Sequence, residues 1–166
     1  MKEIRNAHRV ALRTLHELSF TMQQIQELRA VCSTRMKAFF AIAEEAEEGA
    51  LRSLSSEISL LAASLSAMCL EADARCEFAR MSLLDVLRRL LLVEARTPAV
   101  IFVTRACQTA ISGLDQVEEI VKDAQNQLME ERDSLLELAL LHDASPKVQA
   151  VAEAVIQHAR HGCRSG

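Results

Sequence analysis

Three stretches of this chain carry an apolar residue at every seventh position. The repeats run through Ile4, Ala11, Leu18, Ile25, Cys32, Phe39 and Ala46, through Leu51, Ile58, Leu65, Ala72, Ala79, Val86 and Val93, and through Val100, Cys107, Leu114, Val121, Leu128 and Leu135. A seven-residue repeat keeps one stripe of a helix against a partner and favours a left-handed supercoil. The repeats therefore predict long helices packed side by side.

The composition agrees with an all-α fold. Half of the 166 residues are hydrophobic, yet Trp and Tyr are absent, and only four Gly and two Pro interrupt the chain. Leu, Ala, Glu, Gln and Arg, which are strong helix formers, dominate instead. We expect a single helical-bundle domain over residues 1–160. Residues 161–166 are expected to form a flexible tail.

Breaks in the pattern predict helices over about residues 2–48, 51–96, 98–142 and 146–160. Thr97-Pro98 and Ser145-Pro146 each supply an N-cap followed by a proline at the first helical position. Short connections favour antiparallel neighbours. The predicted architecture is an antiparallel bundle of three long heptad-patterned helices plus a short C-terminal fourth helix.

Gly49 is the predicted break between the first two helices, and the sequence leaves two interpretations open there. A hairpin at Gly49 gives the antiparallel bundle. A bend in one continuous helix gives an extended rod. The glutamates at 44, 45, 47 and 48 count against a helix that ends at this point, because the helix dipole disfavours anions at a C-terminus.

Cysteine usage and hydropathy predict a cytoplasmic protein. Five cysteines are an odd number, and Cys69 and Cys76 would lie ~10 Å apart on one helix, beyond disulfide reach. Free thiols are typical of a reducing compartment. The longest uncharged stretch, residues 58–70, is shorter than a bilayer span requires. We therefore predict no transmembrane segment and no cleaved signal.

The hairpin topology also predicts a separation of charge. Residues 1–16 and 80–112 would form one end, with nine Lys and Arg against three acidic residues. Residues 40–58 and 128–146 would form the other, with ten acidic residues against two Arg. Such polarity suits an acidic partner or head-to-tail self-association, whereas two solvated ends without a partner are the simpler interpretation.

A basic stripe lies within the first predicted helix. Its members, spaced by three or four, are Lys2, Arg5, Arg9, Arg13 and His16. Such a stripe can bind an anionic surface weakly. No interleaved aromatics or nucleic-acid motif accompany it, so no specific nucleic acid is predicted. A solvated helix face is the alternative.

The clearest candidate for partner binding is the apolar stretch 83–93 with the residues just after Thr97. Its apolar residues extend around half of the helix, more than a two-helix contact needs. The candidate anchors are Leu84, Leu87, Leu91, Leu92, Ile101 and Phe102, and Arg88, Arg89 and Arg96 would steer a partner. Either the other two long helices cover this surface, or a second copy or another protein does.

Nothing in the sequence points to catalysis, a cofactor or a metal. No Glu is followed three residues later by His, the pairing that di-metal bundles use. His158, His161 and Cys163 could chelate a metal, but they fall on the predicted tail. No phosphate-binding loop or nucleophile motif is present. We predict no catalytic residues, no cofactor and no metal.

The sequence thus favours a non-enzymatic helical-bundle interaction or scaffold protein that acts through self-association or helix-mediated partner binding. Adaptors, secretion chaperones, sensor bundles and granule-coating proteins share the pattern, and no motif selects among them. The alternative is a ligand-binding or sensor bundle that holds a small molecule or lipid between its helices. Its candidate lining is Ala62, Ala63, Ala67, Ala72 and Ala79.

Overall fold

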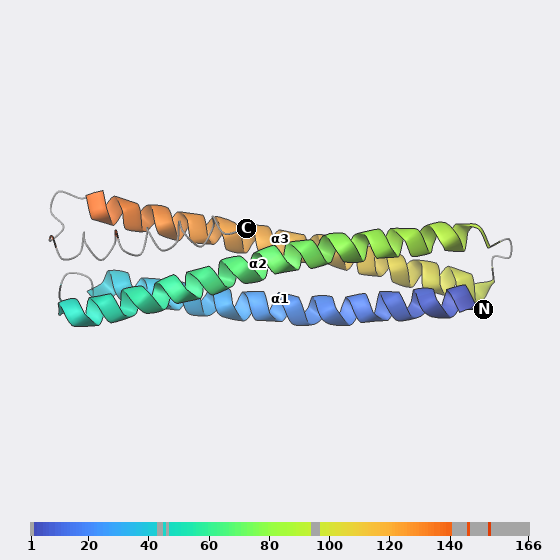
Figure 1. Cartoon of the computed structure of the whole chain (residues 1–166), viewed down its shortest axis with the longest axis horizontal. Coiled ribbons are helices and arrows are strands. Elements are labelled where there is room, and N and C mark those ends of the chain that lie inside the picture. Colours follow the sequence, from blue (N-terminus) through green and yellow to red (C-terminus); the bar gives the residue numbers. More distant parts are fainter. Residues whose placement is uncertain are drawn as a thin grey trace. The chain divides into compact units, whose positions relative to one another are not determined.

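The computed structural model describes residues 2–42, 45, 47–93, 97–140, 146 and 153. Three long helices follow one another: α1 (Lys2–Ile42), α2 (Glu48–Leu91) and α3 (Pro98–Leu140) (Figure 1). No strand occurs among these residues, so the all-α prediction is confirmed for them. The predicted fourth helix lies outside the described residues except for Pro146 and Glu153, and the predicted tail lies wholly outside them.

The first helix ends earlier than the sequence predicts. It stops at Ile42, whose carbonyl oxygen accepts a hydrogen bond from the Glu45 N–H at 3.1 Å. Gly49, the predicted break, lies inside α2, and a Cβ added there would meet nothing within 4 Å. Carboxylates stabilise a helix N-terminus and destabilise a C-terminus. Glu47 lies directly before α2, where a carboxylate is favourable, and its carbonyl oxygen accepts a hydrogen bond from the Leu51 N–H at 3.1 Å.

The second connection follows local capping chemistry. The helix α2 ends at Leu91, before the predicted residue 96, and the Leu92 and Val93 N–H groups donate to the Arg89 and Leu90 carbonyls at 3.2 Å. Such i to i+3 hydrogen bonds tighten a last turn. Thr97 caps α3, because its Oγ1 accepts a hydrogen bond from the Val100 N–H at 3.4 Å. Pro98 is the first residue of α3, as the Thr97-Pro98 dipeptide predicts.

The chain divides into two compact units, and each contains a segment of all three helices. Unit 1 comprises Met1–Gln24 and Glu71–Val121, and unit 2 comprises Ile25–Leu70 and Lys122–Gly166. The single-domain expectation stays a prediction.

The core of unit 1 combines small residues of α1 with larger ones of α2 and α3. Its buried residues include Ala7, Ala11, Thr14, Leu83, Val86, Leu90, Val103, Cys107, Leu114 and Val117. Helices α1 and α3 approach closely at Gly113, where an added Cβ would lie 3.3 Å from Leu18 Cδ1. Arg80 of α2 joins α3 through ion pairs with Asp115 at 2.9 Å and Glu118 at 2.6 Å.

The core of unit 2 receives larger side chains from α1 than the core of unit 1 does. It buries Ile25, Cys32, Met36, Phe39, Leu51, Ile58, Leu65 and Ala124. Polar contacts also join its helices. Arg29 hydrogen-bonds Gln127, and Arg35 forms an ion pair with Glu57 at 2.8 Å.

Helix α2 has a strongly apolar surface as well as an apolar core side. Over Gly49–Leu91 it is long and apolar enough to cross a membrane, by length and composition alone. The mean hydropathy of its most apolar window is 1.4. Core helices of soluble proteins can pass the same test, but only 22% of this window is buried. The absence of a transmembrane segment stays a prediction, and the exposed apolar residues of α2 need an explanation.

Candidate functional site

Within unit 1, α2 exposes an apolar face on the side away from its core. We name it the α2 outer face, and its residues are Phe78, Met81, Leu84, Leu91 and the adjoining Leu92, all exposed. At ~100° per residue, its helical members cover an arc of about 140°, centred opposite the buried Leu83, Val86 and Leu90. The exposed charged residues Glu77, Asp85 and Arg88 lie within the same arc. The described parts of α1 and α3 pack on the core side of α2 and leave its outer face exposed.

The leucines of the α2 outer face forgo the free energy that burial would contribute. Leu91 and Leu92 are 79% and 82% exposed, and Leu84 is 38% exposed, whereas Leu87 is half-buried. Burying a leucine side chain fully is worth ~1.5–3 kcal/mol. The described parts of α1 and α3 therefore leave most of this apolar surface in contact with solvent.

The other predicted docking residues do not all gather on the α2 outer face. Arg88 lies within its arc and is exposed. Ile101 is exposed on α3, but the ring of Phe102 packs against His8 of α1 with 5.7 Å between ring centroids. Arg89 forms an ion pair with Asp85 at 2.8 Å and lies toward α1, as described below. Arg96 lies outside the described residues.

Phe78 and Met81 were missing from the sequence prediction. They lie one turn apart and continue the line that leads to Leu84. The spacing of three residues between Phe78, Met81 and Leu84 indicates that all three share one side of the helix. The prediction started instead at the dense leucine run from residue 83, and so it missed this part of the face.

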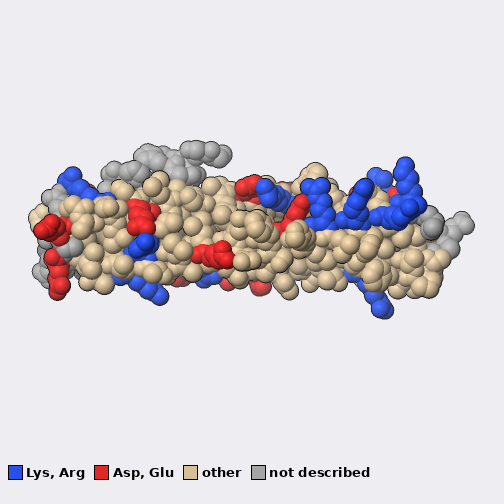
Figure 2. Space-filling model, turned by 90° about the horizontal axis from the view of Figure 1, so that it is seen from below, with Lys and Arg blue, Asp and Glu red and all other residues tan. Residues whose placement is uncertain are grey.

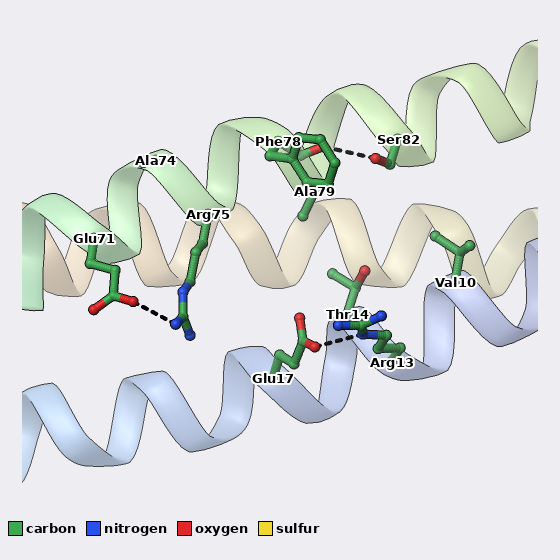
Figure 3. A pocket seen from close by; sticks show the side chains of 10 residues that line it. All are labelled: Val10, Arg13, Thr14, Glu17, Glu71, Ala74, Arg75, Phe78, Ala79 and Ser82. Atoms are coloured by element: carbon green, nitrogen blue, oxygen red, sulfur yellow. Dashed lines mark hydrogen bonds and ion pairs between the residues drawn. The ribbon is translucent and has the colours of Figure 1, made fainter.

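A groove of about 650 Å³ lies between α1 and α2 in unit 1 (Figure 3). We name it the α1–α2 groove, and its lining is Val10, Arg13, Thr14, Glu17, Glu71, Ala74, Arg75, Phe78, Ala79 and Ser82. The Glu17 and Arg75 side chains point into the space between the helices (Figure 3). Small residues of α2 make this room, and Phe78 belongs to both the groove and the α2 outer face.

The charged groups of the groove are paired within their own helices. Arg13 donates to Glu17 at 2.7 Å, and Arg75 pairs with Glu71 one turn before it. Solvent screens exposed ion pairs of this kind strongly. Both carboxylates are more than half exposed, so the groove offers shape and polarity to a ligand.

A second hollow, of about 570 Å³, is rich in cations. We name it the basic hollow, and its lining is Lys2, Glu3, Arg5, Asn6, Arg9 and Arg89. Lys and Arg side chains gather toward the right-hand end of the face that Figure 2 shows. The residues of the predicted basic stripe therefore belong to two different hollows. Arg13 pairs with Glu17 in the α1–α2 groove. Lys2, Arg5 and Arg9 line the basic hollow together with Arg89.

The buried thiols are poor nucleophiles. Burial raises the pKa of Cys32 to about 11, helped by the charge of Glu131, whose Oε2 lies 3.9 Å from the sulfur. Burial raises the pKa of Cys76 to about 11 as well, followed by the nearby charges of Glu118 and Asp73. The thiolate is the reactive form of cysteine, and at neutral pH both groups are protonated. They contribute as small core residues.

The part of the chain described by the structure contains no group of three His, Cys, Asp or Glu placed to bind a metal ion. Within that part, every buried side-chain nitrogen or oxygen has a hydrogen-bond partner. The predicted chelating residues His158, His161 and Cys163 lie outside it.

The alanines of the ligand-binding alternative face different surroundings. Ala72 is buried in unit 1, and Ala79 borders the α1–α2 groove. Ala63 and Ala67 are exposed on the surface of unit 2, and Ala62 is half-buried there. Ala72 and Ala79 both line a small hollow of about 30 Å³ in unit 1, and the three alanines of unit 2 are not part of its lining.

Comparison with known protein families, curated proteins and solved structures finds no match for this chain.

Proposed function

We propose that this chain is a non-enzymatic helical-bundle interaction protein that binds a helix through the α2 outer face. The observation that carries the proposal is the apolar arc of Phe78, Met81, Leu84 and Leu91, opposite the core side of α2. An amphipathic helix lying along α2 would cover residues spaced in this way and complete the bundle. The exposed Glu77, Asp85 and Arg88 within the arc would select a partner with complementary charges at those heights.

The proposed arrangement of the three helices is antiparallel, in up-down-up order. Contacts between α1 and α3 support it. In unit 1, His8 meets Phe102 and Leu18 meets Gly113, so the residue numbers rise together along the two helices. In unit 2, Arg29 meets Gln127 and Cys32 meets Glu131, in the same sense. Parallel first and third helices are what an up-down-up bundle requires.

The ligand-binding alternative has the α1–α2 groove as its support. A volume of about 650 Å³ falls in the range of small-molecule sites. Such sites are mostly apolar and enclosed, whereas four charged side chains line this open groove. The α2 outer face therefore supports helix binding better than the groove supports a small molecule.

Light scattering coupled to size-exclusion chromatography, on reduced protein over a concentration series, tests the proposal. The variant Met81→Gln/Leu91→Gln removes two exposed anchors. Leu60→Gln/Met129→Gln removes two exposed apolar residues of unit 2 and is the matched control. For a self-associating protein, we expect the first variant to weaken association roughly tenfold or more and the control to leave it unchanged. We expect the melting temperature of both variants to equal that of the wild-type protein.

If the wild-type protein is monomeric, the partner is another protein. A photo-crosslinker at position 91 in cells should then join to an α-helical peptide of one defined protein, and one at position 60 should not. A lower melting temperature for Met81→Gln/Leu91→Gln without a change in association would show that these residues stabilise the fold, and the proposed surface would be wrong.

A further inference from the structure

We propose that the basic hollow of unit 1 binds the phosphate groups of a multiply phosphorylated anion. Four cationic side chains from two helices line it, three from α1 and Arg89 from α2. Glu3 is the one carboxylate in that lining. The site lies apart from the residues of the α2 outer face, so this inference goes beyond the proposed helix binding.

The cations of the basic hollow differ in how they are held. Arg9 donates to Asn6 Oδ1 at 3.0 Å, and Arg89 pairs with Asp85 at 2.8 Å, which fixes both side chains beside the hollow. Among the described residues, Lys2 and Arg5 have no ion pair. Like charges in one hollow repel one another, and a bound anion relieves that repulsion. Arg9, Arg89 with its partner Asp85, and two cations that pair with no described carboxylate therefore favour anion binding.

Arginine chemistry points to phosphate among anions. The guanidinium group presents parallel N–H donors that match two oxygens of a phosphate, and three of the four cations here are arginines. On α1, Lys2 and Arg9 are separated by ~10 Å along the helix axis. Cations spread over this length of α1 and on α2 suit a ligand that carries several phosphate groups better than a single phosphate.

The neighbouring arginines provide a sharp internal comparison. Arg13 is on the same helix stripe, but it lines the α1–α2 groove, where it pairs with Glu17 at 2.7 Å, and does not line the basic hollow. Arg88 is next to Arg89 in the sequence, yet it lies within the arc of the α2 outer face and does not line the basic hollow. Replacing these two residues removes the same net charge from the same two helices without touching the hollow.

The test is isothermal titration calorimetry of the full chain with inorganic tripolyphosphate, at two salt concentrations. A parallel sedimentation assay uses vesicles of phosphatidylcholine with and without a polyphosphorylated phosphoinositide. The variant Arg5→Gln/Arg89→Gln removes one cation of each helix from the basic hollow. Arg13→Gln/Arg88→Gln is the matched control.

We expect tripolyphosphate to bind the wild-type chain, more weakly at higher salt. Arg5→Gln/Arg89→Gln should raise its Kd roughly tenfold, and the control less than about twofold. Binding to both probes with this dependence indicates a soluble polyphosphate or a headgroup as ligand. Binding to phosphoinositide vesicles alone, with the same dependence, identifies a lipid headgroup.

Equal weakening by the two variants would show that affinity follows net charge alone and would overturn the site. Failure of both probes to bind the wild-type chain would overturn it as well. Neither variant changes an apolar anchor of the α2 outer face, so the association measured by light scattering reports on the proposed helix binding separately.

Discussion

The two units use the same three helices in opposite ways, and α1 shows the difference best. In unit 1, α1 buries small residues such as Ala7, Ala11 and Thr14. In unit 2, it buries Ile25, Met36 and Phe39. Burial of larger side chains removes more apolar area from water and contributes more stability. Apart from Leu18 in unit 1, the larger side chains that α1 buries therefore lie in unit 2.

The exposed surfaces show the converse. Unit 1 exposes the α2 outer face and has the basic hollow at its surface. Polar contacts join the helices in both units, through Arg29, Cys32 and Arg35 in unit 2 and through Arg80 in unit 1. The two units therefore differ mainly in the α1 side chains that they bury and in the surfaces that unit 1 exposes. One repeat pattern can thus serve two purposes along the same helices, depending on residue size and charge.

Among the variants considered, we expect a substitution in the core of unit 2 to lower the free energy of unfolding most. Phe39 is fully buried, and Phe39→Ala should lower the free energy of unfolding by ~3–5 kcal/mol, because it leaves a cavity. Phe20→Ala, at a position in unit 1 that is 60% exposed, should cost less than ~1 kcal/mol. Urea denaturation followed by circular dichroism measures both. Similar costs for the two variants would show that Phe39 is not buried in solution.

Gly113 in unit 1 and Gly49 in unit 2 differ in the space available for a side chain. An added Cβ at Gly113 lies 3.3 Å from Leu18 Cδ1 and 3.8 Å from Leu15 Cδ2. The larger side chain of Gly113→Val should force α1 and α3 apart and cost ~1–3 kcal/mol. At Gly49 an added Cβ meets nothing within 4 Å, and Gly49→Ala should stabilise α2 by about 0.5 kcal/mol. Thermal unfolding of both variants measures these changes in stability. Stabilisation by Gly113→Val would show that the close approach is absent in solution.

A pH experiment probes the core of unit 2 with the smallest perturbation. The pKa of Cys32 is raised from its ordinary 9.0 to about 11, so the folded state holds this proton more tightly than the unfolded state. The free energy of unfolding should therefore fall as the pH rises from 9 to 11. Cys32→Ala should make this fall less steep, as measured by denaturation in a pH series. An unchanged slope would mean that the thiol is not buried in solution.

The heptad pattern predicted most of the core because it depends only on helix geometry. Leu18, Ile25, Phe39, Leu51 and Ile58 are all buried at repeat positions. Ile4 and Leu128 are only half-buried. The helix boundary near Gly49 was misplaced because the helix dipole acting on the glutamates outweighed the helix-breaking tendency of one glycine.

The candidate site was harder to predict than the core. The sequence pointed to Leu84, Leu91 and Arg88, because an apolar arc can be computed from helical spacing. It could not show that Phe102 would pack against His8, or that Arg13 would pair with Glu17 and leave the basic stripe. Such pairings depend on neighbouring helices and side-chain conformers, which periodicity does not specify.

The ion pairs of Arg80 bear on a weakness inherent in any heptad sequence. A slip of one heptad between two such helices places apolar residues opposite apolar residues again, so the repeat alone does not fix the axial register. Asp115 and Glu118 hold Arg80 on both sides. A slip by seven residues would place it near Lys122 and Gln125 in one direction, or near Gln108 and Ile111 in the other. Neither alternative offers a carboxylate, so one arginine gives α2 and α3 a preferred alignment that the apolar stripe cannot provide.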